Sequence, residues 1–252
     1  MEKISDFDIL QKRNNLVVKS NDLIQKSRFS LSTQEQKIIL FLVSKIKPED
    51  VELKTHRISV KELCDICGIE LNGKNYLNFK NSIKSLADKS FWIDTNETSF
   101  LIRWIEKAKI HKYDNTIEIG LNEELKPYLI ELKENFTNYE LTNILTMKSK
   151  YSIRLYELLK SYSHLRSEIQ YDLEELKSLL QTAKYSDYKN FRVNVLEIAI
   201  NEINEVSDIF VSYEPIREKR KIVSIRFTID NKIDTVDRLR MWSKQEGRYG
   251  RK

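Results

Sequence analysis

The sequence lacks the features that mark several common classes of protein. Its 252 residues include five glycines and three prolines, and neither glycine-rich type of phosphate-binding loop is present. This excludes most nucleotide-binding enzymes. Two cysteines are too few for a disulfide framework, and no apolar run is long enough to span a membrane. Residues 1–15 lack the apolar core of a signal peptide, so we expect a cytoplasmic protein with no membrane partner.

Catalytic and metal-binding patterns are also missing. Cys64 and Cys67 form a lone CxxC, and zinc would need two further ligands, for which His56 and His111 are the nearest candidates. The alternative, that the cysteines fill the buried side of a helix, is favoured. No His-x-His pair is present to hold the metal of a nicking enzyme. We therefore expect no enzymatic activity, no metal and no cofactor.

Positive charge is concentrated late in the chain. The net charge is only +5, although 32% of the residues are charged. Residues 215–226 contain five basic residues against the single acidic Glu218, and residues 231–252 contain seven basic and three acidic residues. Such clusters can neutralise the phosphates of a nucleic acid, whereas the overall balance is common among soluble proteins.

One helical pattern occurs twice, 112 residues apart. Its spacing places the repeated residues on one face of an α-helix, which we expect to face the core. The two sets are Tyr76, Phe79, Ile83, Leu86 and Ala87, and Tyr188, Phe191, Val195, Ile198 and Ala199. Each copy follows two other expected helices and precedes segments that favour β-strands, so the chain reads as two copies of one unit.

Start signals and strand patterns outline these units. Capping boxes are expected at Ser32 with Glu35, at Ser59 with Glu62, and at Asp172 with Glu175. The ranges that predict helices are 32–46, 59–67, 74–89, 122–136 with an internal Pro127, 149–164 and 186–206. The ranges that predict strands are 91–94, 100–110, 116–121, 209–214 and 222–229. The order predicts a mainly α fold with small β wings (α+β), in which two tandem winged-helix domains are related by internal duplication.

The expected organisation has four parts. Residues 1–15 form a flexible N-terminal arm and residues 231–252 a basic tail. Residues 16–133 form an N-terminal winged-helix domain, and residues 134–230 form a C-terminal winged-helix domain.

The outer faces of the two repeated helices carry the candidate DNA contacts. In a helix-turn-helix unit the second helix enters the major groove, where Asn pairs with adenine and Arg with guanine. The predicted contacts on the first helix are Lys74, Asn78, Asn81 and Lys84, and those on the second are Ser186, Lys189, Asn190, Arg192 and Asn194. An ordinary solvated face has the same composition, so residue types alone leave both interpretations open.

The expected hairpins add candidate phosphate contacts. At the second hairpin these are Arg217, Lys219, Arg220, Lys221 and Arg226. At the first they are Arg103, Lys107, Lys109 and Lys112. A charge run at a hairpin turn is also commonly just solvated.

Three longer segments carry a family resemblance. Residues 17–46 and 145–163, together with the helix and strand of 191–214, resemble the plasmid replication initiator family called the initiator replication protein, or Rep type 3, family. The resemblance covers roughly residues 16–230. It implies tandem winged helices that bind repeated origin sequences, called iterons, in double-stranded DNA. The C-terminal domain, residues 134–230, would be the main DNA reader, and the N-terminal domain, residues 16–133, would add DNA contacts and mediate dimerisation.

The resemblance also implies partners. Members of this family commonly exist as dimers that repress their own promoter and as monomers that initiate replication. The host replication initiator and the replicative helicase are candidate partners. Two other functions remain open from the sequence: a winged-helix transcriptional repressor without an initiation role, and a scaffold that uses winged helices for protein contacts.

Overall fold

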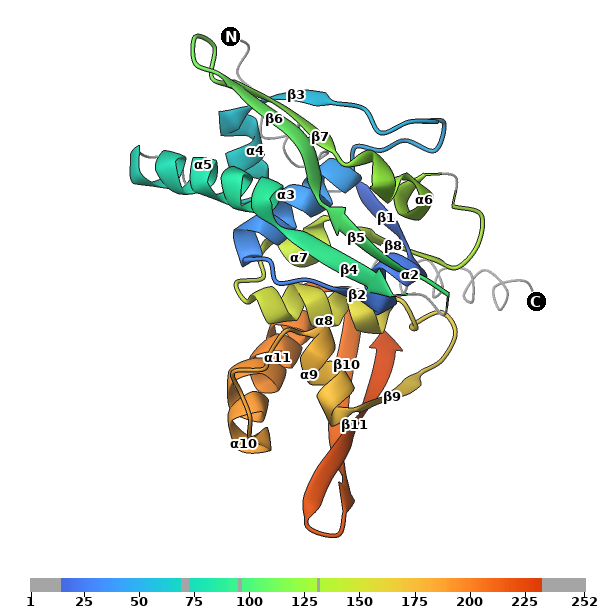
Figure 1. Ribbon diagram of the computed structural model, residues 1–252. Coiled ribbons are helices and arrows are strands. Elements are labelled where there is room, and N and C mark those ends of the chain that lie inside the picture. The colour runs from blue at the N-terminus through green and yellow to red at the C-terminus, as the bar shows by residue number, and fades with distance from the viewer. Residues whose placement is uncertain (1–14, 69–72, 95–96, 131, 233–252) are drawn as a thin grey trace, which may run out of the picture.

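The computed structural model describes residues 15–68, 73–94, 97–130 and 132–232, with residues 73–75 described by their backbone alone. The expected arm, except Asn15, and nearly all of the expected tail lie outside these ranges. The elements of the N-terminal half, coloured blue to green in Figure 1, are β1 (Leu16–Ser20), α2 (Asn21–Lys26), β2 (Ser27–Arg28), α3 (Thr33–Val43), β3 (His56–Ser59), α4 (Val60–Ile66), α5 (Gly73–Asp88), β4 (Ser90–Asp94), β5 (Ser99–Arg103), β6 (Ile105–His111), β7 (Thr116–Leu121), η1 (Glu123–Leu125), α6 (Lys126–Leu129), β8 (Phe136–Glu140) and α7 (Thr142–Leu145).

The C-terminal half has the same plan with fewer strands. Its elements are α8 (Lys150–Lys160), β9 (Glu168–Asp172), α9 (Leu173–Leu179), α10 (Tyr188–Phe191), η2 (Arg192–Leu196), α11 (Glu197–Val206), β10 (Ile209–Glu218) and β11 (Lys221–Asn231). The last two strands form a long antiparallel hairpin, and β9 pairs with the far side of β11. The three helices and the hairpin are those predicted for this half.

The strands of the N-terminal half form three small antiparallel sheets. β1 pairs with β8, β4 lies between β2 and β5, and β7 lies between β3 and β6. The strands predicted at 91–94, 100–110 and 116–121 therefore belong to two different sheets and do not form one wing. The predicted strand 100–110 is broken at Trp104, which is 1% exposed and stacks on Phe91 with ring centroids 4.4 Å apart. Burial of this indole turns the chain from one sheet into the next.

Local start signals explain several helix boundaries. The Ser32 and Glu35 capping box is formed in full: the Ser32 hydroxyl accepts from the Glu35 N–H, and the Glu35 carboxylate accepts from the Ser32 N–H. Asp172 caps α9 through its own side chain. Ser59 precedes α4 without a side-chain cap, so that predicted box is wrong. Gly68, with φ of +67°, follows α4 in the left-handed conformation that favours glycine.

The helix predicted over 122–136 is also wrong. The chain forms the short turns η1 and α6 there and then extends into β8. Pro127 falls in the first turn of α6, where a missing N–H costs little. Because β8 pairs with β1, residues 136–140 pack with the N-terminal half, just beyond the predicted domain boundary at 133/134.

Helix α8 lies between the two halves and is buried on every side. The sequence predicts an amphipathic helix, but every residue from Tyr151 to Lys160 is buried. The helix contacts α11 in its own half and α2 and α3 in the other. The face expected to be solvated is therefore an interface between the halves, which changes the environment of its polar residues.

A buried polar network crosses this interface. Lys19 on β1 and Glu157 on α8 form an ion pair of 2.8 Å, with side chains only 1% and 2% exposed, and the Tyr139 hydroxyl donates to the same carboxylate. Arg154 donates to the carbonyl of Ser27 at 2.9 Å and lies over the ring of Phe29. Burial lowers the pKa of Lys19 although Glu157 opposes it. These contacts join the two halves into one body.

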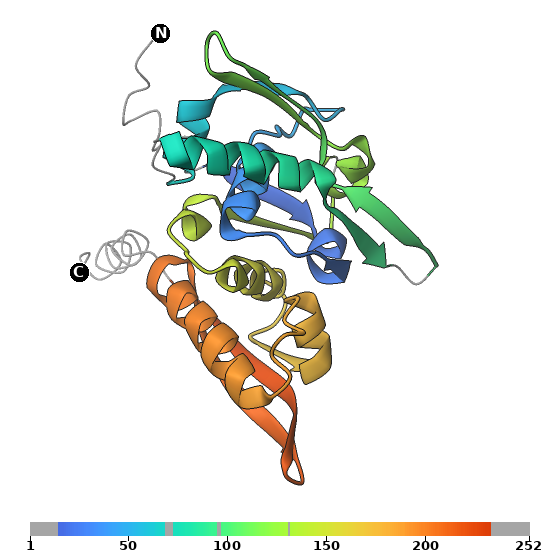
Figure 2. The ribbon, with the colours of Figure 1, turned by 60° about the vertical axis from the view of Figure 1, so that its left-hand side comes forward.

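The two repeated helices face the same side of this body. Figures 1 and 2 show α5 and the α10–α11 segment on one side of the molecule, above and below α8. The β6–β7 hairpin and the β10–β11 hairpin project from opposite ends. The arrangement places two helix-and-hairpin units along one face.

Candidate nucleic-acid interface

The first candidate reading helix is α5. Phe79, Ile83 and Leu86 are buried as the pattern predicts, and Tyr76 packs partly against the same core. Asn78, Asn81 and Lys84 are exposed on the opposite face. Lys74 lies in the first turn of α5, and its side chain is outside the described part of the structure. Lys80, which the pattern analysis did not select, is exposed beside them.

The second candidate reading helix comprises α10, η2 and α11, from Tyr188 to Val206. Asp187 caps its start by accepting from the N–H of Asn190 at 2.8 Å. Lys177 on α9 is buried and donates to the carbonyl of Ser186 at 3.0 Å and to Glu174. This lysine fixes the start of the reading helix to the preceding helix. The sequence analysis missed this role of Lys177 because a lysine in an expected helix is normally exposed to solvent.

The middle of the second reading helix is a π-helical turn. The N–H of Glu197 bonds to the carbonyl of Arg192, five residues back, and η2 is π-helical over Arg192–Leu196. Arg192 and Glu197 also form an ion pair, with 3.4 Å between Nε and Oε1. A regular α-helix would place these two side chains well apart around its axis, so the pair fits the wider turn.

The π turn corrects the predicted core pattern. Ile198 was expected to face the core, but it is 42% exposed. Leu196, at the end of the turn, is buried, and beyond it the buried residues are Ala199, Ile200 and Ile203. The wide turn holds one more residue than an α-helical turn, so the side chains after it are rotated relative to their counterparts in α5.

The predicted readers on this helix are exposed, but several already have partners. The Asn190 side chain donates to Asp187, and the Asn194 side chain donates to the carbonyl of Asn190 at 2.9 Å. Arg192 is held toward Glu197, and both charges act on Tyr213 of β10, whose pKa is raised mainly by burial. Ser186 and Lys189 are exposed near the helix start. Arg192 thus points toward the hairpin side of the helix.

The C-terminal hairpin presents its basic residues as predicted. Lys219 and Arg220 form the turn between β10 and β11, and Arg217 and Lys221 flank it, all four exposed. Lys219 has a φ of +55°, as expected at a tight turn. Arg226 lies farther from the tip and pairs with Glu214 at 2.7 Å. The tip is therefore the most positive part of this hairpin.

The N-terminal hairpin differs from the prediction at one residue. Lys107 and Lys109 lie on β6 and Lys112 in its turn, all exposed, but Arg103 lies on β5 in another sheet. His111 pairs with Glu118 at 2.8 Å, and this contact holds the pKa of the carboxyl below its ordinary value. Three lysines thus remain on the wing.

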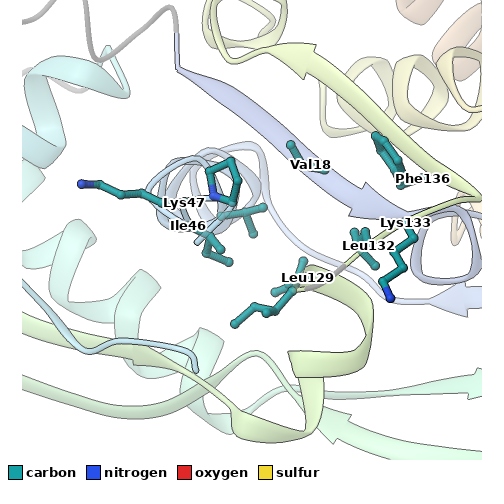
Figure 3. Close-up of a pocket in the computed structure, with 10 residues that line it drawn as sticks. Val18, Ile46, Lys47, Leu129, Leu132, Lys133 and Phe136 are labelled. Atoms are coloured by element: carbon teal, nitrogen blue, oxygen red, sulfur yellow. The ribbon is translucent and has the colours of Figure 1, made fainter. Parts of the chain in front are cut away.

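The cysteines and an apolar pocket lie apart from these surfaces. Cys64 and Cys67 are buried, and burial raises the pKa of the Cys64 thiol to about 11. Within the described ranges, no group of His, Cys, Asp or Glu is arranged to hold a metal. An apolar pocket of about 630 Å³ opens among α3, β1, α6 and β8, and the charged residues among its described lining are Lys47 and Lys133 (Figure 3). No predicted DNA contact is among these described lining residues.

The paired helices with their hairpins define a tandem winged-helix protein, so the predicted fold class is confirmed. In the described part of the chain, no helix is long and apolar enough to cross a membrane. The chain belongs to the initiator replication protein family. The family model described as "Initiator Replication protein, WH1" matches residues 16–160, and the model described as "Initiator Rep protein, WH2" matches residues 172–229. The resemblance read from the sequence is confirmed.

Known relatives agree with this assignment. A replication initiation protein of Escherichia coli is 25% identical over 234 residues, covering 89% of this chain and 73% of that protein. The PI protein of Escherichia coli is 31% identical over 147 residues, covering 50% of this chain and 47% of that protein. The fold is similar to that of the Pi initiator protein in its crystal structure with iteron DNA, with a TM-score of 0.72, 20% identity, and coverage of 88% of this chain and 99% of that one.

Proposed function

We propose that this replication initiator binds iteron repeats at a plasmid origin as double-stranded DNA, acting in the cytoplasm without catalytic chemistry of its own. The observation that carries the proposal is the placement of both reading helices on one side of a single body (Figure 2). Each reader would occupy a major groove, about one helical turn (roughly 34 Å) from the other. The outer faces differ in sequence, so the two half-sites should differ, as in a direct repeat.

The charge distribution supports this placement. Exposed basic residues lie at the tip of the C-terminal hairpin and on the N-terminal hairpin, beyond the two reading helices. There they would meet the phosphates that flank the grooves. We assign base contacts to the helices and phosphate contacts to the hairpins. The host replication initiator and the replicative helicase would then join the bound complex.

Selection of DNA sequences tests the binding proposal. The full chain is mixed at 0.1 M salt with a pool of random duplexes, and bound DNA is amplified and sequenced. We expect an asymmetric site of about 20 bp that occurs as direct repeats beside the gene. A lone palindrome would instead favour the repressor without an initiation role. No enriched sequence would refute specific DNA binding.

Two substitutions test whether the helices contact bases and the hairpins contact phosphates. Asn190→Ala should cost about 1–3 kcal/mol on the selected site and relax specificity at one position. Lys219→Ala should weaken all duplexes alike and flatten the dependence of affinity on salt. Equal losses of specificity from both changes would contradict the assignment of readers and phosphate contacts.

We also propose that the chain forms a homodimer in equilibrium with the monomer, and that the dimer represses the protein's own promoter. Support comes from β5, an edge strand on which Leu101 pairs across one face of the sheet with Trp92 of β4, with exposed fractions of 56% and 49%. Antiparallel pairing of two β5 strands would join the two sheets at this edge and bring the Leu101 side chains of the two copies together on one face. Sedimentation over a range of concentrations should show dimers that Leu101→Asp abolishes, and an unchanged profile would exclude this face.

A further inference from the structure

Val193 is an apolar residue in the middle of the outward face of the second reading helix. It is 43% exposed and lies within the π-helical turn. Phe191 and Val195, on either side of it in sequence, are fully buried, so Val193 points away from the core. Lys189 precedes it by four residues, about one turn of the helix, so the two side chains lie close together around the axis. It therefore shares the face that carries the predicted base contacts.

The polar neighbours of Val193 already have hydrogen-bond or ion-pair partners within the protein, whereas Val193 has no polar group that needs a partner. Asn190 is bonded to Asp187, Asn194 to the helix backbone, and Arg192 to Glu197. Each of these must exchange an existing interaction for one with DNA, which reduces the net gain. An exposed valine gains from any apolar surface that removes it from water.

The major groove offers one apolar group at base edges. Adenine, guanine and cytosine present hydrogen-bonding atoms there, whereas thymine adds its C5-methyl group. A branched aliphatic side chain such as that of Val193 is suited to contact this methyl group, while the polar side chains around it are suited to the hydrogen-bonding atoms. We propose that Val193 reads a thymine by contact with its C5-methyl group. This inference rests on the proposed function, since it needs the second reading helix in a major groove.

Removal of single methyl groups from the DNA tests the contact. The duplex obtained by selection is prepared with 2′-deoxyuridine in place of each thymine in turn, which deletes only the C5-methyl group. The wild-type chain should lose about fourfold in affinity at one position, the equivalent of burying one methyl-sized group. The loss should be the same at 0.1 M and 0.3 M salt, because no charge is involved.

Two variants identify the side chain responsible. Val193→Ala should weaken binding to the thymine duplex by a similar factor and should show no further loss with deoxyuridine at that position. Ile198→Ala is the matched control: it also removes an aliphatic side chain, 42% exposed, from the same helix. It should leave the deoxyuridine effect unchanged. Thermal unfolding of both variants checks that the fold is intact.

The outcomes separate this inference from the proposed function. If the wild-type chain binds its selected site but no deoxyuridine position weakens binding by more than twofold, the thymine contact is refuted while specific binding stands. A deoxyuridine loss that persists in Val193→Ala would assign the methyl group to another residue and also refute the inference. A chain that selects no sequence would refute both proposals.

Discussion

The two reading helices share a core pattern but differ in the middle. α5 is a continuous α-helix, and its buried residues Phe79, Ile83 and Leu86 follow the α-helical spacing. In the second reading helix the π turn interrupts that spacing, and Val195, Ala199 and Ile203 recur every four residues. Aligned sequence positions therefore face different environments after the turn. Duplication preserved the start of the helix more faithfully than its end.

The first helices of the two halves differ as well. α3 has polar and charged residues mainly near its start, whereas α8 buries Arg154, Glu157 and Lys160 along its length. The charged residues of α8 are enclosed because this helix packs against α11 in its own half and against α2 and α3 in the other. A buried charge needs a partner of its own, so α8 should be the more sensitive of the two to loss of a single group.

The largest expected effect comes from breaking the buried pair on α8. Glu157→Ala leaves Lys19 buried without its carboxylate and removes the acceptor of Tyr139. The free energy of unfolding should fall by about 3–5 kcal/mol. Urea denaturation monitored by circular dichroism measures the change.

Matched variants show whether burial causes this loss. Glu214→Ala breaks the exposed pair with Arg226 and should cost at most about 1 kcal/mol. The double variant Lys19→Met with Glu157→Leu should recover part of the stability lost in Glu157→Ala, because Lys19 is no longer buried without its carboxylate. If Glu157→Ala and Glu214→Ala cost the same, the junction does not depend on its buried charges.

The next largest effect is a difference in stability between variants of Leu86 and Ile198, which occupy equivalent positions in the two copies of the repeated pattern. Leu86 is 0% exposed and Ile198, its counterpart 112 residues later, is 42% exposed. Leu86→Ala should lower the free energy of unfolding by about 2–5 kcal/mol through the cavity it leaves. Ile198→Ala should change it by no more than about 0.5 kcal/mol.

Thermal or urea unfolding of these two variants tests the π turn directly. Equal and large losses would mean that Ile198 faces the core, as a regular α-helix predicts, and that the turn is absent. The measurement requires no DNA, so it is independent of the functional proposals.

The smallest expected effect concerns the start of α3. Burial alone would raise the pKa of Glu35, but hydrogen bonds from Lys89, Ser85 and the Ser32 backbone outweigh it and hold the pKa below its ordinary value. A carboxylate with a lowered pKa contributes stability above the pKa of the unfolded chain, about 4.3, and that contribution is lost as the pH falls through the folded pKa. α8 has no acidic residue in its first turn.

Glu35→Gln keeps a capping side chain but removes its charge. The variant should be less stable than the wild type by about 1 kcal/mol at pH 7, and the difference should vanish on acidification below the folded pKa. Urea denaturation at a series of pH values measures this convergence. A constant difference down to pH 3 would show that the charge of Glu35 contributes nothing.

Much of the fold could be predicted from local sequence. The Ser32 and Glu35 capping box, the strand at 116–121 and the basic turn at Lys219 and Arg220 depend on interactions between residues close in the chain. The candidate contacts Asn78, Asn81, Lys189 and Asn190 lie on exposed faces, as helical spacing predicts. Their contact with DNA stays a prediction.

Other features depend on partners distant in the chain. The break at Trp104 reflects its stacking on Phe91, and the role of Lys177 depends on the carbonyl of Ser186. The helix predicted over 122–136 ends at Leu129, and the chain then runs into β8, which pairs with β1, more than a hundred residues earlier. Propensity is a weak guide where such pairing is available.

The sequence alone determined that one unit occurs twice: a helix whose core-facing residues repeat at helical spacing, with helix start signals before it and strands after it. These features follow from the 3.6-residue period and from local hydrogen bonds, both of which are written in neighbouring residues. Tertiary structure decided which faces are available. It placed the π turn that exposes Ile198, and it buried α8 between the halves so that both readers lie on one side. Those outcomes depend on packing between segments far apart in sequence, which no local pattern encodes.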